Sequence, residues 1–218
     1  MINQAEATTT SPGVPSQRPS LVGRFAVFCA LAAIGGGLDL WSKSVIFAWR
    51  GLPTQSDIWW VWEPYFGIET AVNIGAVFGL GAGQGTFFAV MSVIAAIGIF
   101  VWLFVFRAAE SWWLTVALGL VGGGIIGNLY DRMGMWWQPG YPDEWRSGVR
   151  DWILWRINAR WTWPNFNIAD SLLVVGAGML LYQSFFPGQF QSTSTGEVTG
   201  AAPESDPHDS HQPQQETL

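Results

Sequence analysis

The stretch SWWLTVALGLVGGGIIGNLYDR, residues 111–132, decides the fold. Its first 20 residues, between Glu110 and Asp131, carry no charge, and about 20 mostly apolar residues in a helix cross the hydrocarbon core of a bilayer. Three other stretches have the same character. We therefore predict an all-α membrane protein whose four transmembrane helices span about 21–41, 84–106, 111–130 and 168–186.

The composition supports this class. Only 12% of the 218 residues are charged, against about a quarter in soluble domains. The net charge of −6 comes mainly from residues 188–218, which hold five acids and no base, so there is no basic surface for nucleic acid. Residues 1–20 and 188–218 are predicted to be disordered tails, with a membrane domain at 21–187. One cysteine, Cys29, excludes an internal disulfide and a cysteine-based metal site.

The first span has an alternative interpretation as a cleaved signal peptide, in which Arg18 and Arg24 would form the basic region. Its apolar run is long for that role, and a small-residue cleavage site is only loosely defined around Ala30–Ala33. A lipoprotein signal fits poorly, because Phe28 precedes Cys29 where a small residue is expected. We therefore favour a retained helix.

Four spans place both termini on one side of the membrane and two long loops, about 42–83 and 132–166, on the other. Fourteen of the fifteen tryptophans lie at span ends or in these loops, which is typical of the membrane–water interface. We predict a structured layer on the membrane surface, with short strands around 58–72. Three Lys or Arg residues near the spans lie on the terminal side and seven on the loop side. That count would place the loops in the cytoplasm, and it conflicts with the motifs described below.

Polar residues gather at the span ends on the loop side. Asn128 and Asp131 are three residues apart and share a helical face, and Asn167 and Asp170 repeat that spacing. The other candidates are Asp39, Lys43, Asn73, Arg132 and Asp151. Ionisable residues at membrane depth are costly and usually mark function.

Each candidate also has a structural explanation. Asp39 and Lys43, spaced i and i+4, would form a structural ion pair. Asp131 beside Arg132 would be a helix-end charge. Asp151 would be a solvated loop acid, and Asp170 an acid favoured by a helix N-terminus. The stripe of Gly119, Gly123 and Gly127 indicates close helix packing.

Other catalytic chemistries lack their residues. Both histidines, His208 and His211, lie in the C-terminal tail, and there is no zinc-protease helix motif or phosphate-binding loop. Two carboxylates that share a proton remain, one as base and the other as acid, with no metal and no cofactor. The rival class is a small membrane transporter or scaffold. A transporter would place charges near mid-span and often show repeated halves.

Five segments occur in a recognisable order. They are DLWSK (39–43), NIGAVFG (73–79), GNLYDR (127–132), VRD (149–151) and FNIADS (166–171). With them the chain resembles the lipoprotein signal peptidases (signal peptidase II), intramembrane aspartic peptidases of bacteria. The resemblance implies a multi-pass protein of the cytoplasmic membrane with cytoplasmic termini, an active site near the outer face and a small extracytoplasmic β-cradle.

The resemblance also implies roles for residues. The catalytic dyad is Asp151 and Asp170. Asn73, Asn128, Arg132 and Asn167 match positions that hold substrate or dyad, and Asp39, Lys43 and Asp131 match positions that support the architecture. The implied substrate is a prolipoprotein whose lipobox cysteine carries diacylglycerol, cut on the amino side of that cysteine. We expect a monomer in contact with membrane lipid.

Two departures from the family pattern lie in the second long loop. Arg150 stands where an apolar residue usually precedes the dyad acid, and its charge could perturb the pKa of that acid. The segment 134–148 is longer than usual and rich in Trp, Pro and Gly. Because of both features, Asp143 is kept as the alternative to Asp151.

Overall fold

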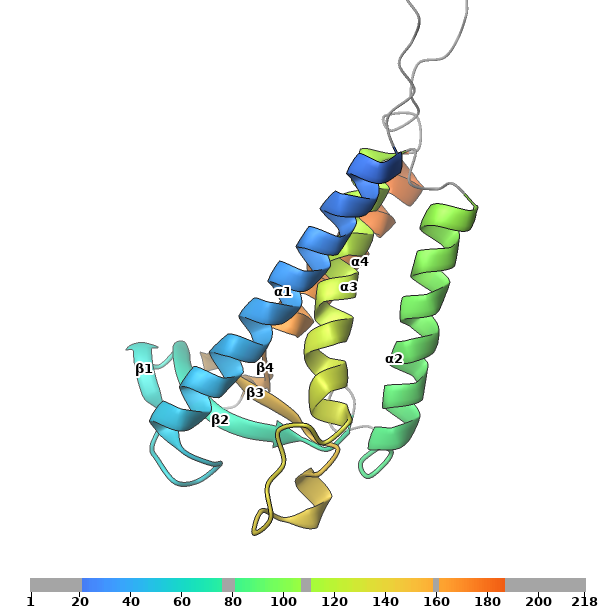
Figure 1. Ribbon diagram of the computed structural model, residues 1–218. Helices are drawn as coiled ribbons and strands as arrows, with labels where there is room; N and C mark the ends of the chain where they lie inside the picture. Colours follow the sequence, from blue (N-terminus) through green and yellow to red (C-terminus); the bar gives the residue numbers. More distant parts are fainter. Residues whose placement is uncertain (1–20, 76–80, 107–110, 159–160, 187–218) are drawn as a thin grey trace, which may run out of the picture.

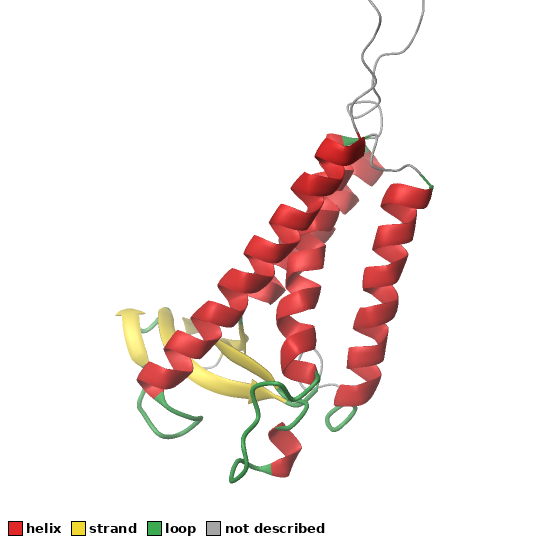
Figure 2. Cartoon of the chain, in the orientation of Figure 1, coloured by secondary structure: helices red, strands yellow, loops and turns green. Residues whose placement is uncertain are grey.

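The computed structural model describes residues 21–75, 81–106, 111–158 and 161–186. Its helices are α1 (Leu21–Arg50), α2 (Gly85–Phe100), α3 (Trp112–Arg132) and α4 (Ile168–Phe185), and α2 continues as a π-helical segment over Val101–Val105. All four are long and apolar enough to cross a membrane. The predicted four-span membrane protein is therefore confirmed (Figures 1 and 2). The two tails predicted to be disordered, 1–20 and 188–218, lie outside the described residues.

Helix α1 is longer than predicted. It continues nine residues past position 41 to Arg50, and at 1.5 Å per residue its 30 residues reach about 45 Å, against about 30 Å for the hydrocarbon core. The charges that suggested an earlier end are buried: the Asp39 and Lys43 side chains are 0% exposed and 2.7 Å apart. A neutralised pair inside the bundle lets the helix continue without placing a charge in lipid.

Helix α3 occupies the middle of the bundle, between α1 and α4, with α2 at its side (Figure 1). Its glycine stripe is the contact with α1, as predicted, since a Cβ on Gly123 would lie 3.2 Å from the Cα of Gly35. A second face meets α4, where a Cβ on Gly124 would lie 2.6 Å from the carbonyl oxygen of Ala169. Glycine lets both helices approach the backbone of α3 closely.

A four-stranded antiparallel sheet lies at the end of the bundle where α1 ends and α4 begins (Figure 1). The strands, in spatial order, are β1 (Trp59–Trp62), β2 (Phe66–Asn73), β3 (Val149–Asn158) and β4 (Trp161–Phe166). The short strands predicted around 58–72 are β1 and β2. Strand β2 pairs with β3, with Ala71 opposite Asp151, so the two long loops form one sheet.

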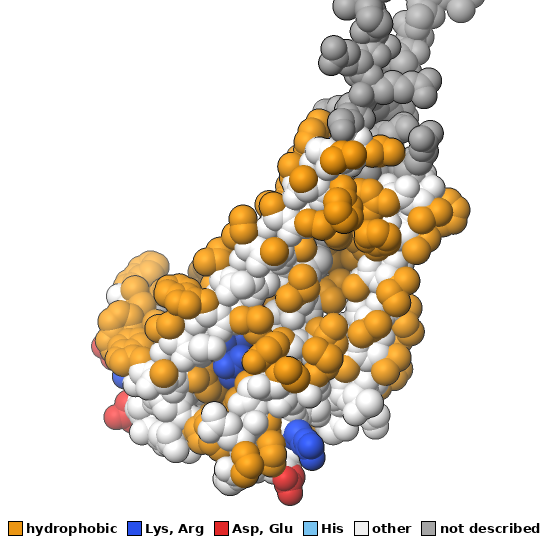
Figure 3. Space-filling model, viewed as in Figure 1, with side chains coloured by type: hydrophobic (Ala, Val, Ile, Leu, Met, Phe, Trp, Pro, Cys, Tyr) orange, Lys and Arg blue, Asp and Glu red, His pale blue; other side chains and the backbone are white. Residues whose placement is uncertain are grey.

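The surface separates into two zones. In Figure 3 apolar side chains cover the helices, and the visible charged ones lie around the sheet and the loops beside it. Several tryptophans of the sheet are more than half exposed, namely Trp62, Trp155, Trp161 and Trp163. Exposed indole rings are typical of the membrane–water interface, which agrees with a layer resting on the bilayer.

Candidate active site

The first turn of α4 fixes Asp170. Asn167 is the N-cap: its side-chain oxygen accepts a hydrogen bond from the Asp170 N–H at 2.8 Å. In return the Asp170 Oδ2 accepts one from the Asn167 N–H at 3.2 Å. This reciprocal arrangement is a capping box, and a carboxylate is favoured there by the helix dipole. The Asp170 side chain is therefore held in one orientation.

Strand β3 brings Asp151 to the same place. Asp151 is 2% exposed, and its Oδ1 accepts a hydrogen bond from the Asn167 side-chain nitrogen at 2.6 Å. The side chain of Asn73 on β2 also interacts with Asp151 and lowers its pKa. Because Asn167 binds both Asp151 and Asp170, the two acids lie on either side of one residue.

The protonation of Asp151 is perturbed by this environment. Burial raises the pKa of Asp151 well above its ordinary value of 3.8, and the nearby Asp170 carboxylate raises it further. Lys43 and the hydrogen bonds from Asn167 and Asn73 act in the opposite direction without cancelling the effect. The protonated form of Asp151 is therefore favoured relative to an exposed aspartate.

Asn128 connects this pair to α3. Its side-chain nitrogen donates to the Asp170 Oδ1 at 2.7 Å, and its oxygen accepts from Lys43 Nζ at 3.0 Å. The same oxygen accepts from the Asn167 side chain at 3.1 Å. Asn128 thus fixes the second oxygen of Asp170.

Lys43 lies at the centre of a buried charge cluster. Its Nζ is 2.7 Å from an oxygen of Asp39 and 3.2 Å from one of Asp131, with all three side chains 0% exposed. The other oxygen of Asp39 accepts from the Ala169 N–H at 2.8 Å, so Asp39 anchors the start of α4. The structural ion pair predicted for Asp39 and Lys43 is confirmed. Asp131 is not a simple helix-end charge, because it is buried and ion-paired.

Arg132 binds the two long loops together. Its Nη1 donates to the carbonyl oxygens of Asn73 at 3.3 Å and Ser147 at 2.9 Å, and its Nη2 donates to that of Gly75. These contacts fix the backbone of Asn73, whose side chain reaches Asp151. The rest of the segment that begins at Asn73, residues 76–79, lies outside the described residues.

Arg150 and Asp143 differ from expectation. Arg150 is not among the causes of the Asp151 pKa shift, because its guanidinium turns away and binds Asp131 at 2.8 Å. Asp143 is exposed in the short helical turn Asp143–Trp145, so it does not reach the pair. The Arg150–Asp131 contact was missed in the sequence. The alternation of side chains along a strand could have indicated this contact, because Arg150 and its neighbour Asp151 must point to opposite faces.

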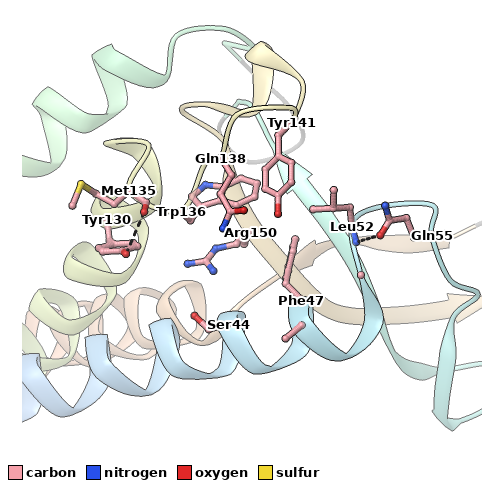
Figure 4. A pocket seen from close by; sticks show the side chains of 12 residues that line it. Ser44, Phe47, Leu52, Gln55, Tyr130, Met135, Trp136, Gln138, Tyr141 and Arg150 are labelled. Atoms are coloured by element: carbon pink, nitrogen blue, oxygen red, sulfur yellow. Dashed lines mark hydrogen bonds between the residues drawn. The ribbon is translucent and has the colours of Figure 1, made fainter.

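Two cavities flank β3. One, of about 440 Å³, is lined by Asp151 and Asn73 together with residues of β2 and β4. The other, of about 570 Å³, lies between the end of α1 and the segment 134–148 and includes Arg150 in its wall (Figure 4). Of the two acids, Asp151 lines the smaller cavity, which is therefore the candidate active-site cleft. Among the described residues, no three His, Cys, Asp or Glu side chains are arranged as a metal site.

Comparisons with known proteins show the family to which the chain is similar. The family model described as signal peptidase (SPase) II matches residues 31–186. The chain is 64% identical to a lipoprotein signal peptidase of Rhodopirellula baltica, over 82% of this chain and 80% of that one. It is 37% identical to that of Pseudomonas aeruginosa, over 61% and 71%.

Two solved structures, each described as a bacterial membrane enzyme, share the fold. One has a TM-score of 0.62 and 24% identity, covering 81% of this chain and 95% of its own. The other has a TM-score of 0.59 and 26% identity, covering 73% and 92%.

Proposed function

Because this chain belongs to the signal peptidase II family, we propose that Asp151 and Asp170 are the catalytic pair of this lipoprotein signal peptidase. The observation that carries the proposal is the bridge made by Asn167, which donates to Asp151 at 2.6 Å and to Asp170 at 3.2 Å. A membrane peptidase of this kind is a hydrolase and needs a group that activates water.

The raised pKa of Asp151 and its burial support a division of roles between the two acids. Asp151 keeps the proton, because burial and the neighbouring carboxylate disfavour its charged form. Asp170 is the base: it takes a proton from a water molecule, which attacks the carbonyl carbon of the scissile bond. Asp151 polarises the carbonyl oxygen through its proton, and the pair then protonates the leaving amine.

The proposed substrate is a prolipoprotein whose lipobox cysteine carries diacylglycerol, cleaved on the amino side of that cysteine. The cleft beside Asp151 supports this choice, since it is bounded by β2 and β4 at the end of a membrane bundle. The lipid chains remain in the bilayer while the peptide bond beside them meets water. No metal or cofactor is needed for this chemistry.

We also propose that the termini are cytoplasmic and that the site faces the outer side of the cytoplasmic membrane. The start of α1 and the end of α4 lie at one end of the bundle, and strand β3 and the start of α4, which carry Asp151 and Asp170, lie at the other (Figure 1). This orientation runs against the count of Lys and Arg residues, as noted from the sequence.

Cleavage of a synthetic lipobox peptide with a diacylated cysteine tests the proposal. Asp151→Asn and Asp170→Asn should each lower turnover by about 10²–10⁴-fold, the usual contribution of acid–base catalysis, without loss of folded protein. Asp143→Asn is the matched control and should keep normal turnover, as should addition of a chelator. Near-normal activity in either dyad variant would refute the assignment. Transport without cleavage would favour the transporter or scaffold alternative.

A further inference from the structure

Arg150 lies immediately before Asp151 on β3 and points to the other side of the strand. Successive strand residues face opposite ways, so Asp151 faces the start of α4 while Arg150 faces the larger cavity. Figure 4 shows Arg150 in the wall of that cavity, next to Trp136. Only 6% of Arg150 is exposed, which is unusual for an arginine.

The carboxylate of Asp131, at the end of α3, binds both the side chain and the backbone N–H of Arg150. The Nη2 of Arg150 is 2.8 Å from Oδ1 of Asp131, and its Nε is 3.2 Å from the same oxygen. Its backbone N–H donates to Oδ2 at 2.9 Å. Charge-assisted bonds with two nitrogens of one guanidinium restrict geometry as well as adding energy.

Aromatic rings complete the environment of the guanidinium. Its central carbon is 5.4 Å from the ring centre of Trp136 and 6.0 Å from that of Phe47. The Trp136 indole N–H in turn donates to the carbonyl of Gly148 at 2.9 Å, just before β3 begins. Arg150 is thus the point where α1, α3, the segment 134–148 and β3 meet. A planar guanidinium suits such stacking, and a lysine ammonium does not replace it.

We propose that Arg150 is a positioning residue. Its bonds to Asp131 fix β3 against the end of α3 and thereby set the position of the Asp151 carboxyl group relative to Asp170. The inference rests on the proposed function of that pair. The backbone of Arg150 is held on both sides of its Cα, at its N–H and at its carbonyl oxygen. Asp131 binds the N–H of Arg150, and the carbonyl of Arg150 lies 3.4 Å from the Asn167 side chain that bridges the two acids.

The expected effect follows from this geometry. A displacement of about 1 Å at a reacting group costs about 10²-fold in rate. Arg150→Met should therefore lower kcat by about 10²-fold. The KM should stay within about threefold of the unmodified enzyme, because no substrate contact is removed. The fold should persist, since Asp131 keeps Lys43 at 3.2 Å.

The experiment measures kcat and KM per folded molecule for three variants with the diacylated lipobox peptide, together with the unfolding temperature. Arg150→Lys keeps the charge but not the two-nitrogen contact, so its kcat should fall by an intermediate factor of about 3–10-fold. Arg156→Met is the matched control, since Arg156 lies on the same strand and stacks on Trp60 at 5.1 Å, away from Asp131. Its kcat should not change.

The outcomes separate the two proposals. If the unmodified enzyme does not cleave the peptide, the proposed function fails. If it cleaves and Arg150→Met keeps a kcat within twofold, positioning by Arg150 is refuted. A higher KM at constant kcat also refutes it, and would make Arg150 a substrate contact. If Arg150→Met does not fold, Arg150→Lys is the variant that tests the inference. Its kcat should fall while its unfolding temperature stays unchanged, and any other result would show that the inference is wrong.

Discussion

Replacement of Lys43 by methionine tests how the charge cluster beneath the active site stabilises the bundle. Methionine has a similar length but no charge, so Lys43→Met removes the cation that Asp39 and Asp131 share at 2.7 and 3.2 Å. Removing one partner of a buried ion pair costs about 3–5 kcal/mol. Asp131 retains Arg150 at 2.8 Å, whereas Asp39 keeps, among the described residues, only the N–H of Ala169.

The loss should therefore lie at the lower end, about 3 kcal/mol in the free energy of unfolding. For a chain of this size about 2–4 °C of unfolding temperature corresponds to 1 kcal/mol, so the variant should unfold about 6–12 °C lower. Thermal unfolding of the purified protein in detergent, followed by tryptophan fluorescence, measures this shift.

The double variant Asp39→Asn with Lys43→Met is the decisive control. Asparagine still accepts the bond from Ala169 but carries no charge, so the double variant should regain about 2 kcal/mol over the single one. The reasoning is wrong if Lys43→Met unfolds within 2 °C of the unmodified protein. It is equally wrong if the double variant is no more stable than the single.

Four further expectations follow from the site and the bundle. Activity should fall as pH rises through the raised pKa of Asp151, because its proton is then lost. Lys43→Met should move this fall in the pH–rate profile to higher pH, since Lys43 lowers the pKa of Asp151. A shift of the fall to lower pH would contradict the assignment. The contribution of Asp151 to the free energy of unfolding also depends on pH. It is complete below the ordinary aspartate pKa of 3.8 and is lost as pH rises through the raised pKa of the folded protein. Unfolding temperatures measured across this pH range would show the loss. Gly124→Ala places a Cβ 2.6 Å from the Ala169 carbonyl and should cost about 1–3 kcal/mol. Gly178→Ala meets nothing within 4 Å inside α4 and should not lower the unfolding temperature, because alanine is favoured over glycine in a helix by about 1 kcal/mol. A reporter fused after Leu218 should give a cytoplasmic signal, and an extracytoplasmic signal would reverse the proposed orientation.

Charge and hydropathy along the chain were enough to give the membrane class and, when the π-helical segment Val101–Val105 is counted with α2, three of the four helices to within two residues at each end. Charge gaps of about 20 residues have one physical solution in a bilayer, a helix that satisfies its own backbone hydrogen bonds. Periodicity and composition also indicated a close helix contact at the glycine stripe of α3, the strands of the first long loop and the Asp39–Lys43 pair. These features depend on neighbours along the chain, or on the solvent that surrounds it.

Residue spacing did not show which distant residues meet: the family resemblance paired Asp151 with Asp170, and the tertiary structure supplies the contacts that join them through Asn167. Asp151 and Asp170 come from a strand and a helix, and only the pairing of β2 with β3 and the N-cap role of Asn167 bring them to one place. The sequence did not show that α1 ends at Arg50 or that Arg150 binds Asp131, because each feature depends on a charge that a residue of another element neutralises. Local sequence records that a charge is present, but the free energy of burying it is set by the groups that the fold places around it.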